Sequence, residues 1–377
     1  MINFSFDNKL YMNKLNHQAI HMDQAITYSP EYRVTRAIRN YPSRVAQVAR
    51  AIHLGELEAS EYSSDMIFSS ILSGLGERWQ NFGENQNDNT LCTILAREMM
   101  VKKGYKEKEV NDLKNTIKSN NNHIIKTSDE ALKAWNDKIE VDENSRVYLL
   151  LDDASFNYTY DNANDVKNLL NKSSIKVKNN IAPCFVGFEY FASGLVKEGT
   201  NRLQEVVNNL QQNDINMVIT LSGQSEYALT TLCEAVGIKH KLKVVSILDL
   251  IDDINCKKSY VYGGSFYTRL LKQSDKINKL VNNTYEEVVK NSWEFTPLLN
   301  ADKRVNKVTM WEMPLCAEYN NEFGNQNLEK DIYKKTLEDM SKIQFKNIVV
   351  FDPYAYNYLK TNNYDMNKVQ YFTSVAN

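Results

Sequence analysis

The cysteines and histidines of this chain do not have the spacing of a metal site. The five cysteines form no CxxC pair and no Cys/His cluster of the kind that binds zinc. They are Cys92, Cys184, Cys233, Cys256 and Cys316. His17 and His21 stand at i and i+4, where two imidazoles could face one metal on a helix, but no third ligand is nearby. An odd number of cysteines suits a reducing compartment in which most thiols are buried and inert.

Two other sites carry groups that could do chemistry at the end of a predicted strand. Ser222 and Ser225 follow an apolar run and open a helical segment, so each could be a helix cap or a nucleophile. A nucleophile there would need a base, and His240 is the only histidine nearby in sequence. Asp352-Pro353 also has the pattern of a helix start, with proline at the first helical position. We therefore expect these residues to cap helices.

The elements that position these residues change in type along the chain. Residues up to about 135 predict mostly helix, with apolar residues at helical spacing in Tyr32–Ile52 and Thr90–Lys103. After Ser145, short apolar runs alternate with helical segments, which predicts parallel sheets covered by helices. The predicted strands are Val147–Leu151, Met217–Leu221, Val244–Leu248 and Ile348–Phe351, and the helices include Ala163–Asn171, Asn201–Leu210 and Leu328–Met340.

The second part of the chain contains an internal repeat. Each copy has a Pro-Cys or Pro-Leu-Cys segment, a helix, an apolar strand and then a polar helix start. The interval from Cys184 to Ser222 is 222 − 184 = 38 residues, and the interval from Cys316 to Asp352 is 352 − 316 = 36 residues. Near-equal intervals predict two similar α/β lobes related by a pseudo-twofold axis.

The bulk properties set limits on location and partners. A length of 377 residues allows two or three domains, and a formal net charge of -2 gives no support for binding nucleic acid. No stretch approaches the length of a transmembrane helix, and the N-terminus lacks the layout of a signal peptide. We expect a soluble cytoplasmic protein, and peripheral attachment to the inner face of a membrane through a complex stays open.

Two N-terminal segments have the spacing of an iron–sulfur motif without its cysteines. The pattern C-x2-C-x2-C-x3-C, followed by proline, binds a four-iron, four-sulfur cluster in ferredoxins. The first segment has this spacing, with Pro30 after its last position, at Ala19, Met22, Ala25 and Ser29. The second has it at Ser70, Ser73, Gly76 and Gln80. Iron in such clusters is held by thiolates, which none of these residues can supply.

The whole chain resembles the fused iron–sulfur subunits that join a two-cluster ferredoxin module to two CCG (cysteine-rich) domains. Familiar members are the B, C and D subunits of heterodisulfide reductase and the iron–sulfur subunits of glycolate oxidase and of anaerobic glycerol-3-phosphate dehydrogenase. The resemblance implies an α/β protein with an N-terminal all-α, degenerate ferredoxin-like module at 1–135. Two Rossmann-like CCG lobes related by the pseudo-twofold would follow at 136–256 and 257–377.

The resemblance also places the family's cluster-ligand cysteines at positions that this chain fills with other residues. In the first lobe these positions are Ala154, Ser222 and Ser225, and in the second they are Ser265, Asp352 and Ala355. One residual thiol stays in each lobe, Cys184 and Cys316. A single thiolate per lobe cannot hold a multi-iron cluster, so we expect no cofactor and no metal. We also expect neighbouring side chains such as Met22, Trp79 and Phe82 to fill the emptied N-terminal sites.

The function that the resemblance implies is structural. The chain would be a cluster-free, non-catalytic subunit of a larger redox complex, with a flavoprotein, a hydrogenase or an iron–sulfur paralogue as partner. One alternative is an enzyme that uses Cys184, Cys316 or Asp352 in the cleft between the lobes, on a thiol or another small molecule. Another is an assembly factor or regulator for an active iron–sulfur paralogue.

Overall fold

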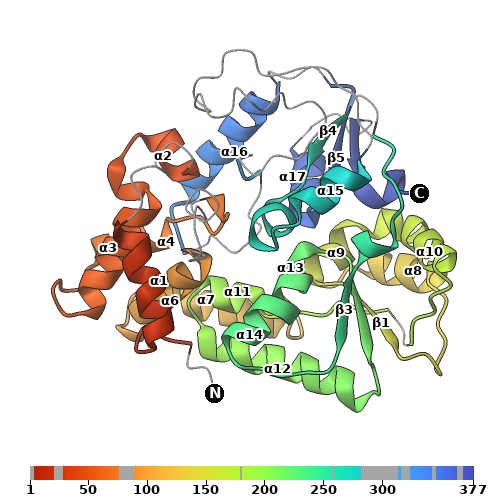
Figure 1. Ribbon diagram of the computed structural model, residues 1–377, viewed down its shortest axis with the longest axis horizontal. Coiled ribbons are helices and arrows are strands. Elements are labelled where there is room, and N and C mark those ends of the chain that lie inside the picture. Colours follow the sequence, from red (N-terminus) through yellow and green to blue (C-terminus); the bar gives the residue numbers. More distant parts are fainter. Residues whose placement is uncertain are drawn as a thin grey trace.

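The computed structural model describes residues 4–20, 29–75, 89–178, 181–256, 259–281, 313–315, 323–341, 345–362 and 368–377. The protein is mixed α/β, with N-terminal helices on one side of the molecule and two small parallel sheets beside them (Figure 1). Within the described residues, no helix combines the length and apolar character needed to span a bilayer.

The N-terminal part is helical, as predicted. Its helices are α1 (Lys9–Ile20), α2 (Pro30–Thr35), η2 (Ile38–Asn40), α3 (Pro42–His53), α4 (Glu61–Phe68), α6 (Asn89–Lys102), α7 (Glu107–Ser119) and α8 (Asp129–Lys138). The helix predicted over Thr90–Lys103 is confirmed as α6. The single helix predicted over Tyr32–Ile52 is wrong, because the chain is extended at Tyr41 before Pro42 and a new helix begins there.

The first sheet has strand order β1-β2-β3, all parallel: β1 (Val147–Leu150), β2 (Met217–Thr220) and β3 (Lys243–Ser246). The connections contain α9 (Asp153–Tyr158), η3 (Tyr160–Asn162), α10 (Ala163–Lys172), α11 (Phe188–Ala192), α12 (Val196–Gln212), α13 (Gly223–Tyr227), η4 (Ala228–Leu232) and α14 (Cys233–Ala235). The short helix η5 (Ile247–Leu250) follows β3 directly, so the strand predicted over Val244–Leu248 ends earlier than expected.

The second sheet has the order β4-β5-β6 and is also parallel: β4 (Ser259–Tyr262), β5 (Asn347–Val350) and β6 (Val369–Tyr371). The helices described around it are η6 (Phe266–Leu270), α15 (Ser274–Leu280), α16 (Gln326–Ser341), α17 (Pro353–Thr361) and η10 (Phe372–Val375). The prediction of parallel sheets covered by helices is confirmed.

The two sheets share more than strand order. In each, the middle strand runs into a helix whose N-cap is a polar residue, Ser222 for α13 and Asp352 for α17. In each, the third strand passes directly into a 3₁₀ helix, η5 or η10. The register is also equivalent, since the last residue of the first strand pairs with the last residue of the middle strand, Leu150 with Thr220 and Tyr262 with Val350. An internal repeat predicts this correspondence.

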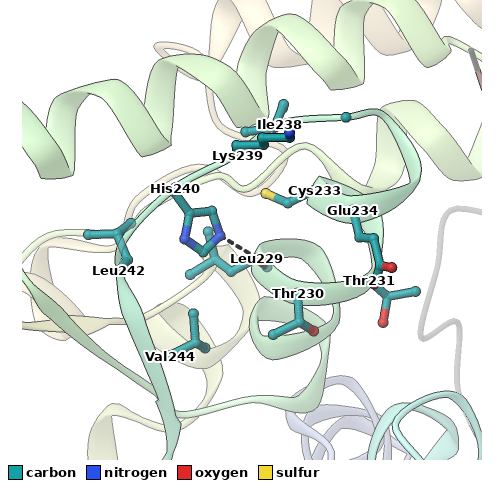
Figure 2. A pocket seen from close by; sticks show the side chains of 11 residues that line it. Leu229, Thr230, Thr231, Cys233, Glu234, Ile238, Lys239, His240, Leu242 and Val244 are labelled. Atoms are coloured by element: carbon teal, nitrogen blue, oxygen red, sulfur yellow. Dashed lines mark hydrogen bonds between the residues drawn. The ribbon is translucent and has the colours of Figure 1, made fainter. Parts of the chain in front are cut away.

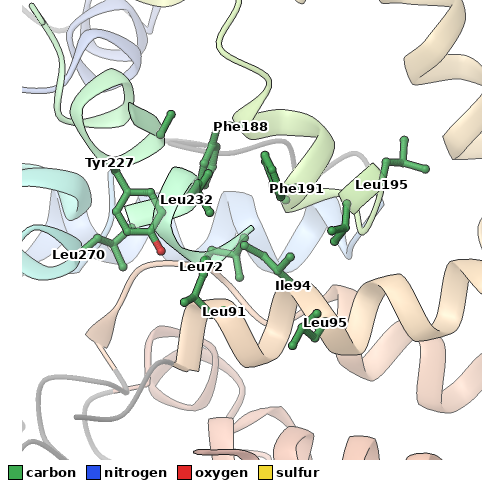
Figure 3. Close-up of a cluster of buried hydrophobic side chains, with 14 of the residues drawn as sticks. Leu72, Leu91, Ile94, Leu95, Phe188, Phe191, Leu195, Tyr227, Leu232 and Leu270 are labelled. Atoms are coloured by element: carbon green, nitrogen blue, oxygen red, sulfur yellow. The ribbon is translucent and has the colours of Figure 1, made fainter. Parts of the chain in front are cut away.

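One hydrophobic core joins the N-terminal helices to the first sheet. Leu91, Ile94 and Leu95 of α6 pack on the side of α11 that carries Phe188 and Phe191 (Figure 3). Farther along the chain, α8 packs on α9 and α10 beside the first sheet and spans the predicted boundary at residue 135. The N-terminal helices are therefore fixed to the first sheet by continuous apolar packing.

Candidate functional site

Some of the predicted site residues lie outside the described residues. These are Met22, Ala25, Gly76, Gln80 and Cys316, together with Trp79 and Phe82, which were expected to fill the emptied sites. The other positions lie at the carboxyl edges of the two sheets, in the loop that follows α4, at the end of α1 and at the start of α2.

At the first sheet, Ser222 and Ser225 converge on one carboxylate. Asp152 follows β1, is buried, and accepts hydrogen bonds from the Ser222 hydroxyl and, at 2.7 Å, from the Ser225 hydroxyl. Ser222 also caps α13 by accepting from the Ser225 N–H at 3.1 Å, and Asp152 caps α9 by accepting from the Ser155 N–H at 2.8 Å. The expected capping role of Ser222 is confirmed. Carboxylate–hydroxyl bonds therefore fix the two serines to the neighbouring strand end.

The other first-sheet positions are a buried alanine and a cysteine with a raised pKa. Ala154 is buried inside α9. Cys184 is half-buried, and its N–H donates to the Leu151 carbonyl at 2.8 Å. Burial raises the pKa of the Cys184 thiol to about 12, although the Arg202 guanidinium nearby acts in the opposite direction. A thiol with that pKa is a poor nucleophile at neutral pH.

A buried carboxyl group links the two sheets. Glu189 of α11 accepts hydrogen bonds from Gln224 Nε2 at 2.8 Å and from the Tyr354 hydroxyl of α17 at 3.0 Å, both at its Oε1. Its Oε2 is buried with no hydrogen-bond partner in the described part of the chain. Burial raises the pKa of Glu189 from 4.5 to about 7 against the opposing hydrogen bond from Gln224, so the neutral form is more populated than in an exposed glutamate.

Close packing and tyrosines complete the contact between the sheets. The Tyr267 hydroxyl of η6 donates to the Leu221 carbonyl at 3.3 Å, which joins the end of β2 to the second sheet. Burial, with nearby acidic groups, raises the pKa of Tyr267 and of Tyr371 well above the ordinary value. We name the set Asp152, Glu189, Ser222, Gln224, Ser225, Tyr267 and Tyr354 the inter-sheet network. The carboxyl and hydroxyl groups of this network can hold protons and fix the positions of α11, α13 and α17, and the network contains no cysteine.

Gly223 marks how closely the two sheets approach each other. A Cβ added at this position would lie 2.7 Å from the Phe266 Cβ and 3.0 Å from the Tyr267 N of η6. We expect Gly223→Ala to destabilise the protein by about 1–3 kcal/mol, because neither contact can relax without moving η6. Urea denaturation measures the loss, and hydrogen exchange should show lost protection at β4 and η6.

Gly199→Ala is the matched comparison for Gly223→Ala. Its Cβ would meet the Phe191 ring at 2.7 Å, but that ring belongs to the elements beside the first sheet. In Gly199→Ala, amide hydrogen exchange should therefore increase around α11 and α12, while η6 stays protected. Equal protection of β4 and η6 in both variants would contradict a specific inter-sheet contact at Gly223.

At the second sheet, the predicted positions are likewise occupied by internal bonds. Asp352 accepts from the Ala355 N–H at 2.8 Å as the N-cap of α17, with Pro353 as the first helical residue, which confirms the expected helix start. Ala355 is fully buried. The Ser265 hydroxyl accepts a hydrogen bond from Nη2 of the buried Arg269.

The same arginine reaches the N-terminal part of the molecule. Arg269 Nε donates to the Ser73 carbonyl, so one guanidinium joins a predicted ligand position of the second sheet to one of the N-terminal motif. The backbone is close here as well, since a Cβ at Gly74 would lie 2.9 Å from Leu270 Cδ2. The loop after α4 is therefore packed directly on η6.

A second buried arginine, Arg97 of α6, organises the loop after α4 from the other side. Its guanidinium lies 5.4 Å from the Phe68 ring and donates from Nη2 to the carbonyl of Ser70, at 2.5 Å, and from Nη1 to the carbonyl of Ala192. The side chain is almost fully buried. Arg97 thus ties the predicted ligand position Ser70 to the end of α11.

Ser29 belongs to a buried acidic contact near the same loop. Its hydroxyl accepts from the Tyr32 N–H at 3.2 Å as the N-cap of α2 and donates to Glu31 Oε2 at 2.6 Å. Glu31 in turn accepts from the Ile71 N–H, and burial raises its pKa from 4.5 to about 7. Ala19 is buried at the end of α1, where its carbonyl accepts from Gln47 of α3.

His240 does not serve as a base for Ser222. Its Nε2 lies 2.8 Å from the Leu229 carbonyl, and its ring lines a cavity of about 930 Å³ between η4, α14 and β3 (Figure 2). Cys233 lies in the same cavity, where burial raises its pKa to about 12. The walls of this cavity are largely apolar, through Ile238, Leu242 and Val244.

The sequence did not lead us to predict the residues whose side chains form hydrogen bonds with the predicted ligand positions. Asp152 could have been found, because an acidic residue directly after a predicted strand lies at the carboxyl edge of a sheet. Arg97 and Arg269 gave no signal, since most of their partners are backbone carbonyls of distant loops. Across the described ranges, no group of three or more His, Cys, Asp or Glu side chains has the geometry of a metal site.

Comparisons with known proteins do not assign this chain to a family. No protein-family model, no curated protein and no solved structure matches this chain.

Proposed function

We propose that this chain is a cluster-free, non-catalytic structural subunit of a larger redox complex, related to the CCG-domain iron–sulfur subunits. In this proposal the N-terminal helices are a degenerate ferredoxin-like module and the two sheets belong to CCG-like lobes in a Rossmann-like arrangement. The proposed partner is a flavoprotein, a hydrogenase or an iron–sulfur paralogue, and the proposed location is cytoplasmic.

One observation carries the proposal: the predicted ligand positions that are described are built into hydrogen bonds within the protein. Asp152 binds Ser222 and Ser225, Arg269 binds Ser265 and the Ser73 carbonyl, and Arg97 binds the Ser70 carbonyl. An iron–sulfur module commonly depends on its metal for stability. Charged and polar side chains that organise the same loops offer a replacement for that stabilisation.

The distribution of exposed apolar side chains also supports a role in assembly. In the described residues, most large apolar side chains that are at least 40% exposed lie between residues 10 and 62, and the others are Leu132 and Val141. The N-terminal ones are Leu10, Ile20, Ile38, Leu54, Leu57 and Tyr62. Exposed apolar residues gathered in one part of a molecule favour a protein interface there.

The enzyme alternative receives less support from the geometry. Cys184 lines a cavity bounded by residues between 123 and 215, whereas Asp352 caps α17 at the second sheet. The raised pKa of Cys184 also disfavours a thiolate nucleophile. We therefore do not assign a reaction to these two groups.

Purification of the tagged protein from its native source, with identification of the bound subunits, tests the proposal. We expect a colourless chain, without stoichiometric iron or acid-labile sulfide, that co-purifies in fixed ratio with redox subunits. Stoichiometric iron and sulfide in the isolated chain would overturn the cluster-free assignment. A transient association with an iron–sulfur paralogue would instead indicate an assembly factor, and a monomer whose activity is lost on alkylation would indicate an enzyme.

A further inference from the structure

A second cavity, of about 480 Å³, lies beside the first sheet between β1, residues 182–184 and α12. Its polar lining includes His123, Tyr148, Arg202, Asn209 and Asn213. Its apolar wall is formed by residues of α12 and of the segment that leads to β2, among them Val206 and Ile215. This volume and this mixture of an apolar wall with convergent polar groups are typical of small-molecule sites.

The protein holds the Arg202 guanidinium firmly at the wall of this cavity. Nε donates to the Phe185 carbonyl at 2.8 Å, and the guanidinium lies 5.8 Å from the centre of the Phe185 ring. The one acidic partner of Arg202 in the described chain is Glu205, at 3.4 Å, and the Glu205 side chain is 67% exposed. Because an exposed ion pair is weak, Glu205 does not cancel the positive charge of Arg202.

His123, which also lines the cavity, is oriented by the buried Asp153. Its Nδ1 lies 2.7 Å from Asp153 Oδ1, and Asp153 also accepts from the Ile124 N–H at 2.6 Å. This contact fixes the ring and leaves Nε2 as the nitrogen that can meet a ligand. A further cation lies close by, since Lys178 Nζ donates to the Asn213 carbonyl at 2.6 Å.

We infer that this cavity binds a small anion, a carboxylate or phosphate carried on an apolar body, with the anionic group on Arg202 and the apolar body against α12. The fixed guanidinium supplies a charge-assisted hydrogen bond, and His123 and Asn209 add polar contacts beside it. This binding site is independent of the proposed scaffold role, because residues of this chain form it and it needs no partner subunit.

Cys184 serves as a reporter for the cavity. It lines the cavity and is half-buried, whereas Cys92, Cys233 and Cys256 are buried. Because burial raises the pKa of the Cys184 thiol, its labelling is slow, so the native protein is treated for hours with excess N-ethylmaleimide. Peptide mass spectrometry then measures the labelling rate of Cys184 separately from the rates of the other cysteines. A ligand on Arg202 should slow the labelling of Cys184 and leave the other cysteines unchanged.

The test uses inorganic phosphate and benzoate as probes at constant ionic strength, with affinity measured by calorimetry. We expect at least one probe to bind and to protect Cys184, and we expect Arg202→Gln to weaken that binding roughly tenfold or more, the cost of one lost charge-assisted hydrogen bond. Asn209→Glu, which adds a negative charge without removing the Phe185 contact, should weaken it as well. Lys197→Gln, an exposed change on α12, should have no effect.

Two results would overturn the inference. One is the absence of binding and of Cys184 protection with both probes. The other is binding that Arg202→Gln and Asn209→Glu leave as strong as in the natural protein. Preference for benzoate over phosphate would assign the site to carboxylates, and the reverse preference would assign it to phosphates.

Discussion

Replacing Arg97 by alanine should destabilise the protein by about 3–5 kcal/mol, because several buried carbonyls lose a charged donor at about 1–3 kcal/mol each. The guanidinium donates to the Ser70 and Phe68 carbonyls and to the Ala192 carbonyl, and alanine leaves these acceptors unsatisfied. It also leaves a cavity between α6, α11 and the loop after α4. Urea or thermal denaturation, followed by circular dichroism, measures the loss.

Two variants control the Arg97 experiment. Arg97→Lys keeps the charge and loses the planar geometry that reaches several carbonyls, so it should recover only part of the stability. Arg39→Ala removes an exposed arginine that contacts Tyr62, and it should change stability by well under 1 kcal/mol. A loss at Arg97 no larger than the loss at Arg39 would contradict the organising role of the buried guanidinium.

The strands and helix caps of this protein follow mostly from local sequence, whereas the contacts of the buried side chains depend on residues far apart in the chain. Four of the strands were predictable, because each is a short apolar run between helices. The caps at Ser222 and Asp352 were predictable as well, because the residue types and the proline at 353 favour helix starts. β4 and β6 were missed, since each has only three or four residues and includes a polar one.

The contacts at the predicted ligand positions could not be read from the sequence. Arg269 meets Ser73 across 196 residues, and Arg97 meets Ala192 across 95, so only the folded chain brings the partners together. The spacing of the serines predicted the positions of these loops, and it did not predict that an arginine would bind them. Glu189 was missed for a related reason, because an acidic residue in a helical segment normally predicts an exposed position.

Glu189 should make the stability of the protein depend on pH in an unusual direction. Its pKa is about 7 in the folded protein and 4.5 ordinarily, so the folded state holds the proton more tightly than the unfolded state. The contribution to stability is then fully present below pH 4.5 and is lost as the pH rises through about 7. The groups that face this carboxyl are Gln224, Tyr354 and Asp153, and none is a cation that would favour its ionised form.

Glu189→Gln tests this dependence, since glutamine keeps the hydrogen bonds from Gln224 and Tyr354 and cannot ionise. The stability of Glu189→Gln relative to the natural protein should rise by on the order of 3 kcal/mol between pH 4.5 and pH 8, which corresponds to the shift in pKa. Urea titrations across this range measure the difference. Glu205→Gln, an exposed change on α12, is the control and should give a nearly constant difference. A constant difference for Glu189→Gln as well would mean that this carboxyl is solvated and that the inter-sheet network is open to water.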